Sequence, residues 1–365
     1  MPILTDKIRD AVIKGNLKAR GQSIHRIRKK NLNHPAAKWL SKNRLRKGVG
    51  DALAIVLATS GCAHARSESG GCIMCSYLLD GSAEKPTAEQ LVEQFQSALL
   101  EIKENASPLG VKVYTSGSFL DSTEVPEEAR DGILQIIGAD DRISDIVLES
   151  RPEYVTEATM SSVRSFLEGR HIEIGVGLES ASDEVRSLCI NKGFTKEDFE
   201  RAVKTAEKHD IGVRAYVLLK PPFLTEYAAL KDAVETMVYA AQVGVSTISV
   251  NPVNIQRHTL VEQLWTHGQY RPPWLWTLVE VLKTTRTKVD ENVPIICDPV
   301  AAGRARGVHN CGRCDSRITE AIREFSIDQN PDALSELECG CINLWHHVLE
   351  HEDISLLVHT HRLES

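Results

Sequence analysis

The sequence predicts an α/β protein with a partial, TIM-like (β/α)6 barrel as its core and a small C-terminal region stapled by a metal. Apolar runs with strand character alternate with amphipathic helical segments across 49–290. A cysteine loop follows the first apolar run directly, and five of the nine cysteines gather in 297–341. The composition, with 42 % hydrophobic and 25 % charged residues among 365, is that of an ordinary globular protein.

Six segments are expected to form parallel strands joined by right-handed crossovers, because each is followed by a helical pattern. The first, 52–59, is continuously apolar, as expected for a strand covered on both faces. The other strand candidates are 111–115, 145–149, 172–176, 213–219 and 247–250. The clearest helical patterns are 87–105, 196–209, 225–242 and 275–288. A flat doubly wound sheet remains the alternative. In a barrel, the groups at the C-terminal strand ends carry the chemistry.

Three regions are expected: a basic N-terminal leader with helical character over 1–48, the barrel core over 49–290 and a cysteine-rich region over 291–365. The leader holds fourteen Lys or Arg against two acidic residues, whereas the whole chain carries a net charge of −7. Its basic runs, 26–30 and 44–47, could contact a phosphate backbone. A solvated basic helix explains the same pattern.

A cytoplasmic location is expected. No run of eighteen apolar residues predicts a membrane span, and the N-terminus has no apolar signal core. Nine cysteines in a reducing compartment bind metals more often than they form disulfides. Cys189, which stands alone, is interpreted as a small buried hydrophobe without a further role.

The loop after the first strand carries Cys62, Cys72 and Cys75 in the spacing C-x9-C-x2-C. Three thiolates suit a 4Fe–4S cluster, because they bind three irons and leave the fourth open. An open iron can chelate the methionine part of S-adenosylmethionine (SAM), and electron transfer then yields a 5′-deoxyadenosyl radical. A zinc site completed by His64 is the alternative.

A second group of soft ligands lies near the C-terminus. The predicted zinc ligands are Cys311, Cys314, Cys339 and Cys341, with Cys297 or His309 as substitutes. Four sulfurs suit a closed, tetrahedral structural site. A second iron–sulfur cluster remains the alternative.

The stretch 59–77, with its Thr-Ser-Gly-Cys start and Gly-Gly-Cys-x-Met-Cys-x-Tyr end, resembles the cysteine loop of the radical SAM superfamily. It has the long spacing of the elongator-type subunit and is closer still to the radical SAM subunit of archaeosine synthase. The resemblance extends over 35–345. The His-Asn-Cys-x-x-Cys and Cys-x-Cys tail is similar too, which implies shared ligation without identifying the metal.

The resemblance implies roles for residues at successive strand ends. Met74 and Tyr77 are expected near the adenine of SAM. Gly117 and Ser118 match a turn that binds the SAM amino group, although the Glu of that motif is missing. Glu149 is expected to hold SAM or substrate hydroxyls, Glu179 the ribose and Lys192 the SAM carboxylate.

Substrate contacts are expected from four further residues. Arg151 lies in Glu-Ser-Arg-Pro-Glu, which resembles a motif common in tRNA-acting relatives, and could bind a carboxylate. Lys220, Asn251 and Asn254 follow the last two strands and are expected at the mouth opposite the cluster.

The function that the resemblance implies is a tRNA modification. The radical would abstract hydrogen from a lysine-adducted 7-deazaguanine in archaeal tRNA, and C–N cleavage would leave archaeosine. The implied partners are tRNA, a separate lysine-transferring subunit and a small electron donor such as a ferredoxin. The alternatives are an elongator-like radical SAM modification and a non-catalytic zinc or iron–sulfur subunit that binds tRNA.

Overall fold

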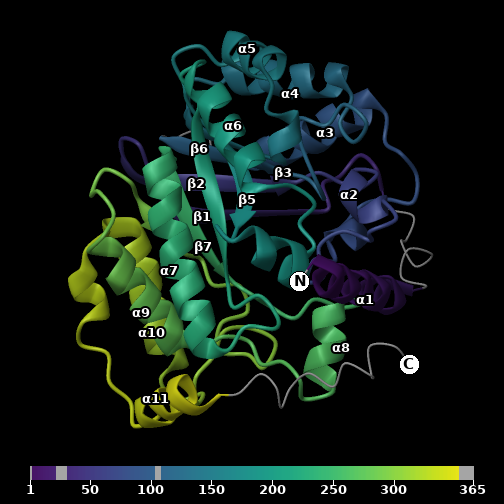
Figure 1. Ribbon diagram of the computed structural model, residues 1–365. Coiled ribbons are helices and arrows are strands. Elements are labelled where there is room, and N and C mark those ends of the chain that lie inside the picture. Colours follow the sequence, from purple (N-terminus) through teal and green to yellow (C-terminus); the bar gives the residue numbers. More distant parts are fainter. Residues whose placement is uncertain (1, 22–30, 103–107, 353–365) are drawn as a thin grey trace.

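A single eight-stranded sheet organises the protein in a computed structural model that describes residues 2–21, 31–102 and 108–352 (Figure 1). Its strands follow one another in chain order, with β1 antiparallel to β2 and all later neighbours parallel. The strands are β1 (Ala37–Leu45), β2 (Gly48–Val56), β3 (Leu109–Tyr114), β4 (Ile143–Ser150), β5 (His171–Glu179), β6 (Gly212–Leu219), β7 (Thr247–Pro252) and β8 (Ile295–Ile296).

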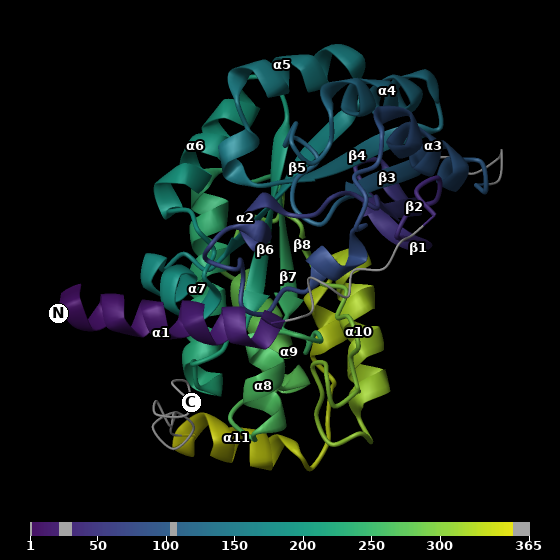
Figure 2. The same ribbon diagram turned by 90° about the vertical axis from the view of Figure 1, so that its right-hand side faces the viewer.

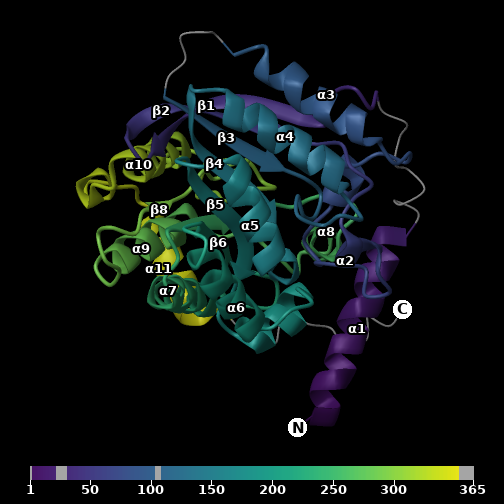
Figure 3. The ribbon, with the colours of Figure 1, turned by 90° about the horizontal axis from the view of Figure 1, so that it is seen from above.

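The sequential strand order decides between the two expected sheet types. A doubly wound sheet reverses its direction at an internal strand, so that helices cover both faces. Here every crossover from β2 to β8 advances the sheet in the same direction, and the connecting helices lie around one convex face (Figure 3). The sheet curves away from them as a half-barrel, which confirms the predicted fold class.

Most connecting helices begin where the sequence indicates. Thr87 and Thr195 cap α3 and α6, each in a capping box that satisfies the first backbone donors. No described helix is both long and apolar enough to cross a membrane. The α-helices are α1 (Pro2–Arg20), α2 (Ala63–Arg66), α3 (Ala88–Leu99), α4 (Glu127–Ala139), α5 (Glu157–Phe166), α6 (Lys196–Glu207), α7 (Glu226–Val243), α8 (Leu260–Thr266), α9 (Leu275–Arg286), α10 (Asp315–Asp328) and α11 (Ile342–His351), and the short turns are η2 (Tyr77–Asp80), η3 (Pro152–Tyr154), η4 (Val185–Ile190) and η5 (Pro331–Leu334).

The two faces of the half-barrel differ in chemistry. Residues such as Ile146, Ile174 and Val213 point to the helices and are fully or almost fully buried in the main core. Strand side chains on the other face pair among themselves, as the Lys112 ammonium does with Asn43 Oδ1 at 2.6 Å. The concave side therefore carries polar side chains, although the first strand candidate, 52–59, is continuously apolar.

The basic N-terminal segment is not helical throughout. Pro2–Arg20 form α1, but Ala37–Leu45 form β1, which pairs with β2 along its whole length. The helix of the expected leader therefore ends before the residues that add an edge strand to the sheet. The basic run 26–30 lies outside the described residues. The other run, 44–47, spans the end of β1 and the turn into β2.

The C-terminal segment also contributes to the half-barrel. Its β8 pairs with β7, and α10 contacts both β1 and β8, the two edge strands of the sheet. Arg44 of β1 donates a hydrogen bond to the Ile327 carbonyl of α10 at 3.2 Å. The cysteine-rich region thus spans the gap between the edges of the sheet.

Candidate active site

The cysteine loop lies at the carboxyl ends of the parallel strands, where the predicted polar residues also lie. Cys62, Cys72 and Cys75 follow β2, and the turn that contains Gly117 follows β3. Glu149 is the second-last residue of β4, and Glu179 ends β5. The topology therefore gathers residues more than one hundred positions apart around one loop, as expected for a barrel.

Glycines allow this loop to pack closely against its neighbours. A Cβ atom on Gly71 would lie 2.6 Å from Cα of Ala65, and one on Gly117 would lie 2.6 Å from Cα of Cys62. Gly71 also has a φ of 71°, in the left-handed region that favours glycine. Both positions exclude any larger residue.

The three cysteines have different environments. Burial alone would raise the pKa of Cys72, but Lys192, His64 and Arg151 lower it to about 7. Burial raises the pKa of Cys75 to about 12 and also raises that of Cys62, and the Cys72 charge adds to both shifts. The three thiols therefore interact electrostatically, and Cys72 ionises first.

His64 does not complete a compact metal site with these cysteines. Its Nε2 bonds to the Asn191 carbonyl at 2.7 Å, and its ring packs against Gly193. Among the described residues, the four C-terminal cysteines alone bring three or more potential ligand atoms within 4.8 Å of one another. His64 hydrogen-bonds Cys72, but it and the three thiols do not gather as closely as the ligands of a single ion would. Three spaced thiols fit a cubane open at one iron better than a single zinc ion.

Glu124 is a site residue that the sequence analysis missed. Its buried carboxylate accepts hydrogen bonds from the backbone N–H of Gly117 at 3.1 Å and of Ser118 at 2.8 Å, and from the Thr59 hydroxyl at 2.6 Å. It thereby fixes the turn after β3 to the start of the cysteine loop. Glu124 lies seven residues after Gly117 in the sequence, a spacing that no local motif signals.

Lys192 and Glu179 form an ion pair of 2.7 Å in which both side chains are nearly buried. A Cβ on Gly177 would lie 2.5 Å from both charged groups, so glycine makes room for the pair. Glu179 has a φ of 63°, a strained backbone conformation that is most often kept at functional sites. The Lys192 ammonium also lowers the pKa of Cys72, so its charge acts on the cysteine loop as well as on the carboxylate.

Glu149 and Arg151 lie beside this pair. Burial, together with the charges of Glu124 and Glu179 and against the opposing effect of Lys192, raises the pKa of Glu149 to about 8. Arg151 donates to Glu153 at 2.5 Å and to the Lys192 carbonyl at 3.2 Å. The Arg151 guanidinium, predicted to bind a substrate carboxylate, thus already has a carboxylate partner.

Met74 and Tyr77 flank the last cysteine differently. Met74 is half-buried and packs into a small core beside the loop. Tyr77 exposes 48 % of its surface, and its backbone carbonyl accepts a hydrogen bond from the Ser116 hydroxyl at 2.9 Å. Only Tyr77 therefore offers a large exposed ring next to Cys75.

Lys220 does not line the mouth as predicted. Its ammonium is 2.6 Å from Glu226 and 3.4 Å from Glu352, and its side chain is 3 % exposed. Two carboxylates therefore neutralise the Lys220 ammonium, which was expected to contact the substrate. Asn251 donates to the Ser249 carbonyl at 3.2 Å, and Asn254 is half-buried.

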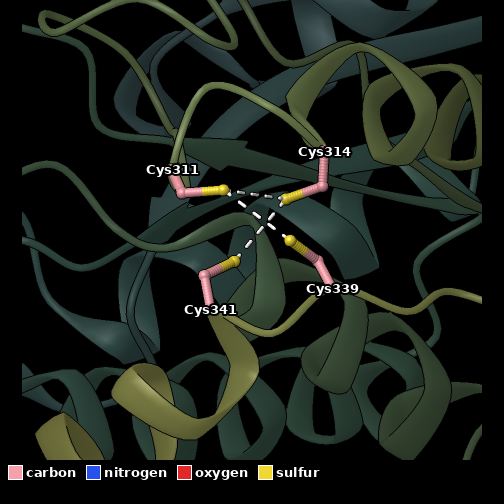
Figure 4. A group of neighbouring side chains, drawn as sticks. All are labelled: Cys311, Cys314, Cys339 and Cys341. Carbon is pink, nitrogen blue, oxygen red and sulfur yellow. Dashed lines mark hydrogen bonds between the residues drawn. The ribbon is translucent and has the colours of Figure 1, made fainter.

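The C-terminal cysteines converge from two segments of the chain (Figure 4). The sulfur of Cys311 lies 3.8 Å from that of Cys314 and 3.7 Å from that of Cys339, and the Cys314 and Cys341 sulfurs are 3.6 Å apart. A tetrahedral ion with metal–sulfur bonds of about 2.3 Å requires sulfur–sulfur edges of roughly 3.8 Å. The spacing fits one tetrahedral ion better than a cubane, which holds its thiolates further apart.

Hydrogen bonds support two of these sulfurs. Trp276 Nε1 donates to Cys341 at 3.3 Å, and Asn310 Nδ2 lies 3.5 Å from the Cys314 sulfur. Such donors stabilise thiolate ligands. Cys297 is buried and His309 bonds to the Gly307 carbonyl, and both lie outside the four-sulfur group.

A half-barrel that carries a three-cysteine loop at the carboxyl ends of its strands defines the radical SAM class of proteins, as the motif resemblance indicated. Solved structures with weak similarity to this chain include the Elp3 protein of Methanocaldococcus infernus. Its TM-score is 0.48, with 13 % identity over 68 % of this chain and 60 % of that chain. Methylornithine synthase has a TM-score of 0.44 and 11 % identity over 80 % and 84 %.

The particular family follows from sequence comparison. No family model matches the chain. Archaeosine synthase subunit beta of Methanosarcina acetivorans is 42 % identical over 323 residues, which cover 88 % of this chain and 92 % of the relative. The protein of the same name from Thermococcus kodakarensis is 38 % identical over 86 % of this chain and 96 % of the relative. The chain belongs to the family of archaeosine synthase subunit beta.

Proposed function

We propose that the protein is a radical SAM enzyme that modifies tRNA, cleaving a C–N bond of a lysine-adducted 7-deazaguanine to give archaeosine. The observation that carries this proposal is the identity of 42 % with archaeosine synthase subunit beta over nearly the whole chain. The three-cysteine loop, placed where polar strand ends converge, supports the same chemistry from the structure.

In this proposal, the residues of the candidate site have distinct roles in cofactor binding. Cys62, Cys72 and Cys75 would hold a 4Fe–4S cluster, which would supply the electron for the reductive cleavage of SAM. Lys192 stands at the cysteine loop and binds the SAM carboxylate, while Glu179 orients the ammonium. Glu124 fixes the Gly117 turn, whose carbonyls are left to accept the SAM amino group.

Further residues surround the substrate in this proposal. Glu149, with its raised pKa, can be protonated near neutral pH and then donate a hydrogen bond to a SAM or substrate oxygen. The half-exposed ring of Tyr77 suits the adenine environment. Asn251 and Asn254 remain candidates for substrate contacts. A lysine-transferring subunit supplies the adduct, and a small donor such as a ferredoxin supplies electrons.

The four-cysteine group binds zinc as a structural staple in this proposal. It has no open ligand position and lies in a different region of the chain from the cysteine loop. Nine free thiols suit a reducing cytoplasm.

The test uses protein purified without oxygen. With dithionite and SAM, it should release 5′-deoxyadenosine, and with lysine-adducted tRNA it should form archaeosine detectable by nucleoside mass spectrometry. Release of 5′-deoxyadenosine without archaeosine would favour an elongator-like modification. Colourless protein that binds tRNA but leaves SAM intact would show a non-catalytic subunit.

A further inference from the structure

Helix α1 lies outside the half-barrel but contacts the cysteine loop with one of its faces. Its N-terminal half projects from the body of the protein, whereas its C-terminal half lies against the loop region (Figures 2 and 3). Val12, Asn16 and Arg20 recur every four residues and therefore share that face. Val12 packs with Ile73 of the loop in a small core, and Asn16 and Arg20 are buried as well.

The two polar residues of this face donate to four carbonyls of the loop. Arg20 Nη2 donates to the carbonyls of Cys72 at 3.0 Å and of Cys75 at 2.9 Å. Asn16 Nδ2 donates to those of Gly70 at 3.2 Å and Gly71 at 2.9 Å. The loop has little regular structure of its own, so these buried carbonyls depend on side-chain donors.

A second element holds the loop by the same type of bond. Asn191, which ends η4 in a left-handed conformation, donates through Nδ2 to the carbonyls of Ser69 at 3.0 Å and Gly71 at 2.8 Å. The Ile73 N–H donates to the Ile190 carbonyl at 3.0 Å. The segment that carries Cys72 is therefore clamped between α1 and η4.

Arg20 also brings a positive charge to this place. Among the described residues it has no carboxylate partner, and its Nε has no hydrogen-bond partner, although the residue is only 5 % exposed. Its guanidinium is directed at the backbone of two of the three cysteines. A buried cation in that position favours negative charge on the group that those cysteines hold.

We propose that Arg20 and Asn16 are positioning residues that make helix α1 a part of the cluster site. Asn16 fixes the Gly70–Gly71 turn, and Arg20 fixes the backbone at Cys72 and Cys75 and stabilises the reduced cluster. The electrostatic half of this inference rests on the proposed function, because it requires a cluster on the cysteine loop. The mechanical half, that the two side chains fix the backbone of the cysteine loop, does not require a cluster.

Hydrogen exchange of protein that lacks the 4Fe–4S cluster but keeps its C-terminal metal tests the mechanical half. In Arg20→Met and Asn16→Ala, backbone amides of 69–75 should exchange about tenfold faster than in the unmodified protein, while those of β3–β6 stay protected. Lys18→Met, an exposed position on the same helix, is the matched control and should leave the loop unchanged. Equal exchange in Arg20→Met and Lys18→Met would overturn the clamp.

A redox titration monitored by electron paramagnetic resonance tests the electrostatic half. The cluster of Arg20→Met should have a lower midpoint potential than that of Lys18→Met, and Arg20→Lys, which keeps the cation, should retain the higher value. A residue with a merely structural role would change cluster content without moving the potential. The same potential in all three variants would overturn the charge effect, and no cluster in the unmodified protein would refute the proposed function instead, leaving the exchange result valid.

Discussion

At the scale of single residues, one ammonium group links a carboxylate to the cysteine loop. Lys192 pairs with Glu179 and acts on Cys72 through its charge. Glu124 similarly connects two turns that the chain separates by more than fifty residues. Both pairs of groups are buried. Removing one partner therefore leaves the other buried without its ion pair or hydrogen bond.

Replacing Cys72 with Ala should abolish SAM cleavage. Without Cys72, one of the three cysteine-bound irons of the proposed four-iron cluster loses its ligand, so iron content should fall with activity. Iron analysis and 5′-deoxyadenosine release after dithionite measure both. Cys189→Ala is the control, because that buried thiol lies outside the loop. Full iron and retained turnover in Cys72→Ala would remove the cluster assignment.

Replacing Glu149 with Gln should flatten the pH dependence of stability in the metal-free protein. The folded pKa of about 8 lies above that of an unfolded Glu, so the folded state binds the proton more tightly. The free energy of unfolding should therefore fall as pH rises from about 4.5 to about 8, by at most about 1.4 kcal/mol per pH unit.

Urea unfolding at several pH values within this window measures the effect. The Gln variant, which cannot titrate at this position, should lose less stability than the unmodified protein as pH rises. Parallel curves for the two proteins would show that Glu149 ionises normally.

At the scale of elements, the helices and parallel strands follow from local pattern, whereas β1 does not. Helices α6, α7 and α9 lie close to the predicted 196–209, 225–242 and 275–288, because apolar spacing indicates all three. Thr caps add to this signal at α6 and α7. In β1, the exposed Lys42 and Arg44 are typical of an edge strand. The same basic residues resemble a solvated leader when partners are unknown.

Replacing Cys311 with Ala should release the C-terminal metal and lower the melting temperature. The four sulfurs connect the segment before α10 to the segment before α11, so the loss frees both. Metal analysis and thermal unfolding check this, and elemental identification distinguishes zinc from iron. Cys297→Ala, outside the group, should keep its metal. A variant at Cys311 that keeps both metal and melting temperature would refute the site.

At the scale of the whole molecule, tertiary contacts connect the two edges of the sheet and attach α1 to the cysteine loop. Helix α10 contacts both edge strands, and α1 contacts the loop that follows β2. Glu226 joins three further parts, because its carboxylate binds Lys220 after β6, the Trp274 N–H at 2.8 Å and the Thr277 hydroxyl at the start of α9.

Replacing Glu226 with Ala should therefore destabilise the fold strongly. It leaves the Lys220 ammonium buried with only the more distant Glu352, and breaking a buried ion pair costs about 3–5 kcal/mol. Denaturant unfolding measures the change. Glu235→Ala on the same helix is the control, because it is exposed. A loss below about 1 kcal/mol would show that Glu352 or water replaces the pair.

The sequence by itself determined what depends on neighbours along the chain: the parallel strands, the amphipathic helices, and the spacing of Cys62, Cys72 and Cys75. Tertiary structure decided what depends on residues far apart. It paired β1 with β2 and brought Glu124 to the turn at Gly117. It also paired Lys220 with Glu226 and brought Arg20 against the cysteine loop. The reason is physical: periodicity reports which side of an element is buried, whereas the partner of a buried charge is set only when distant segments pack together.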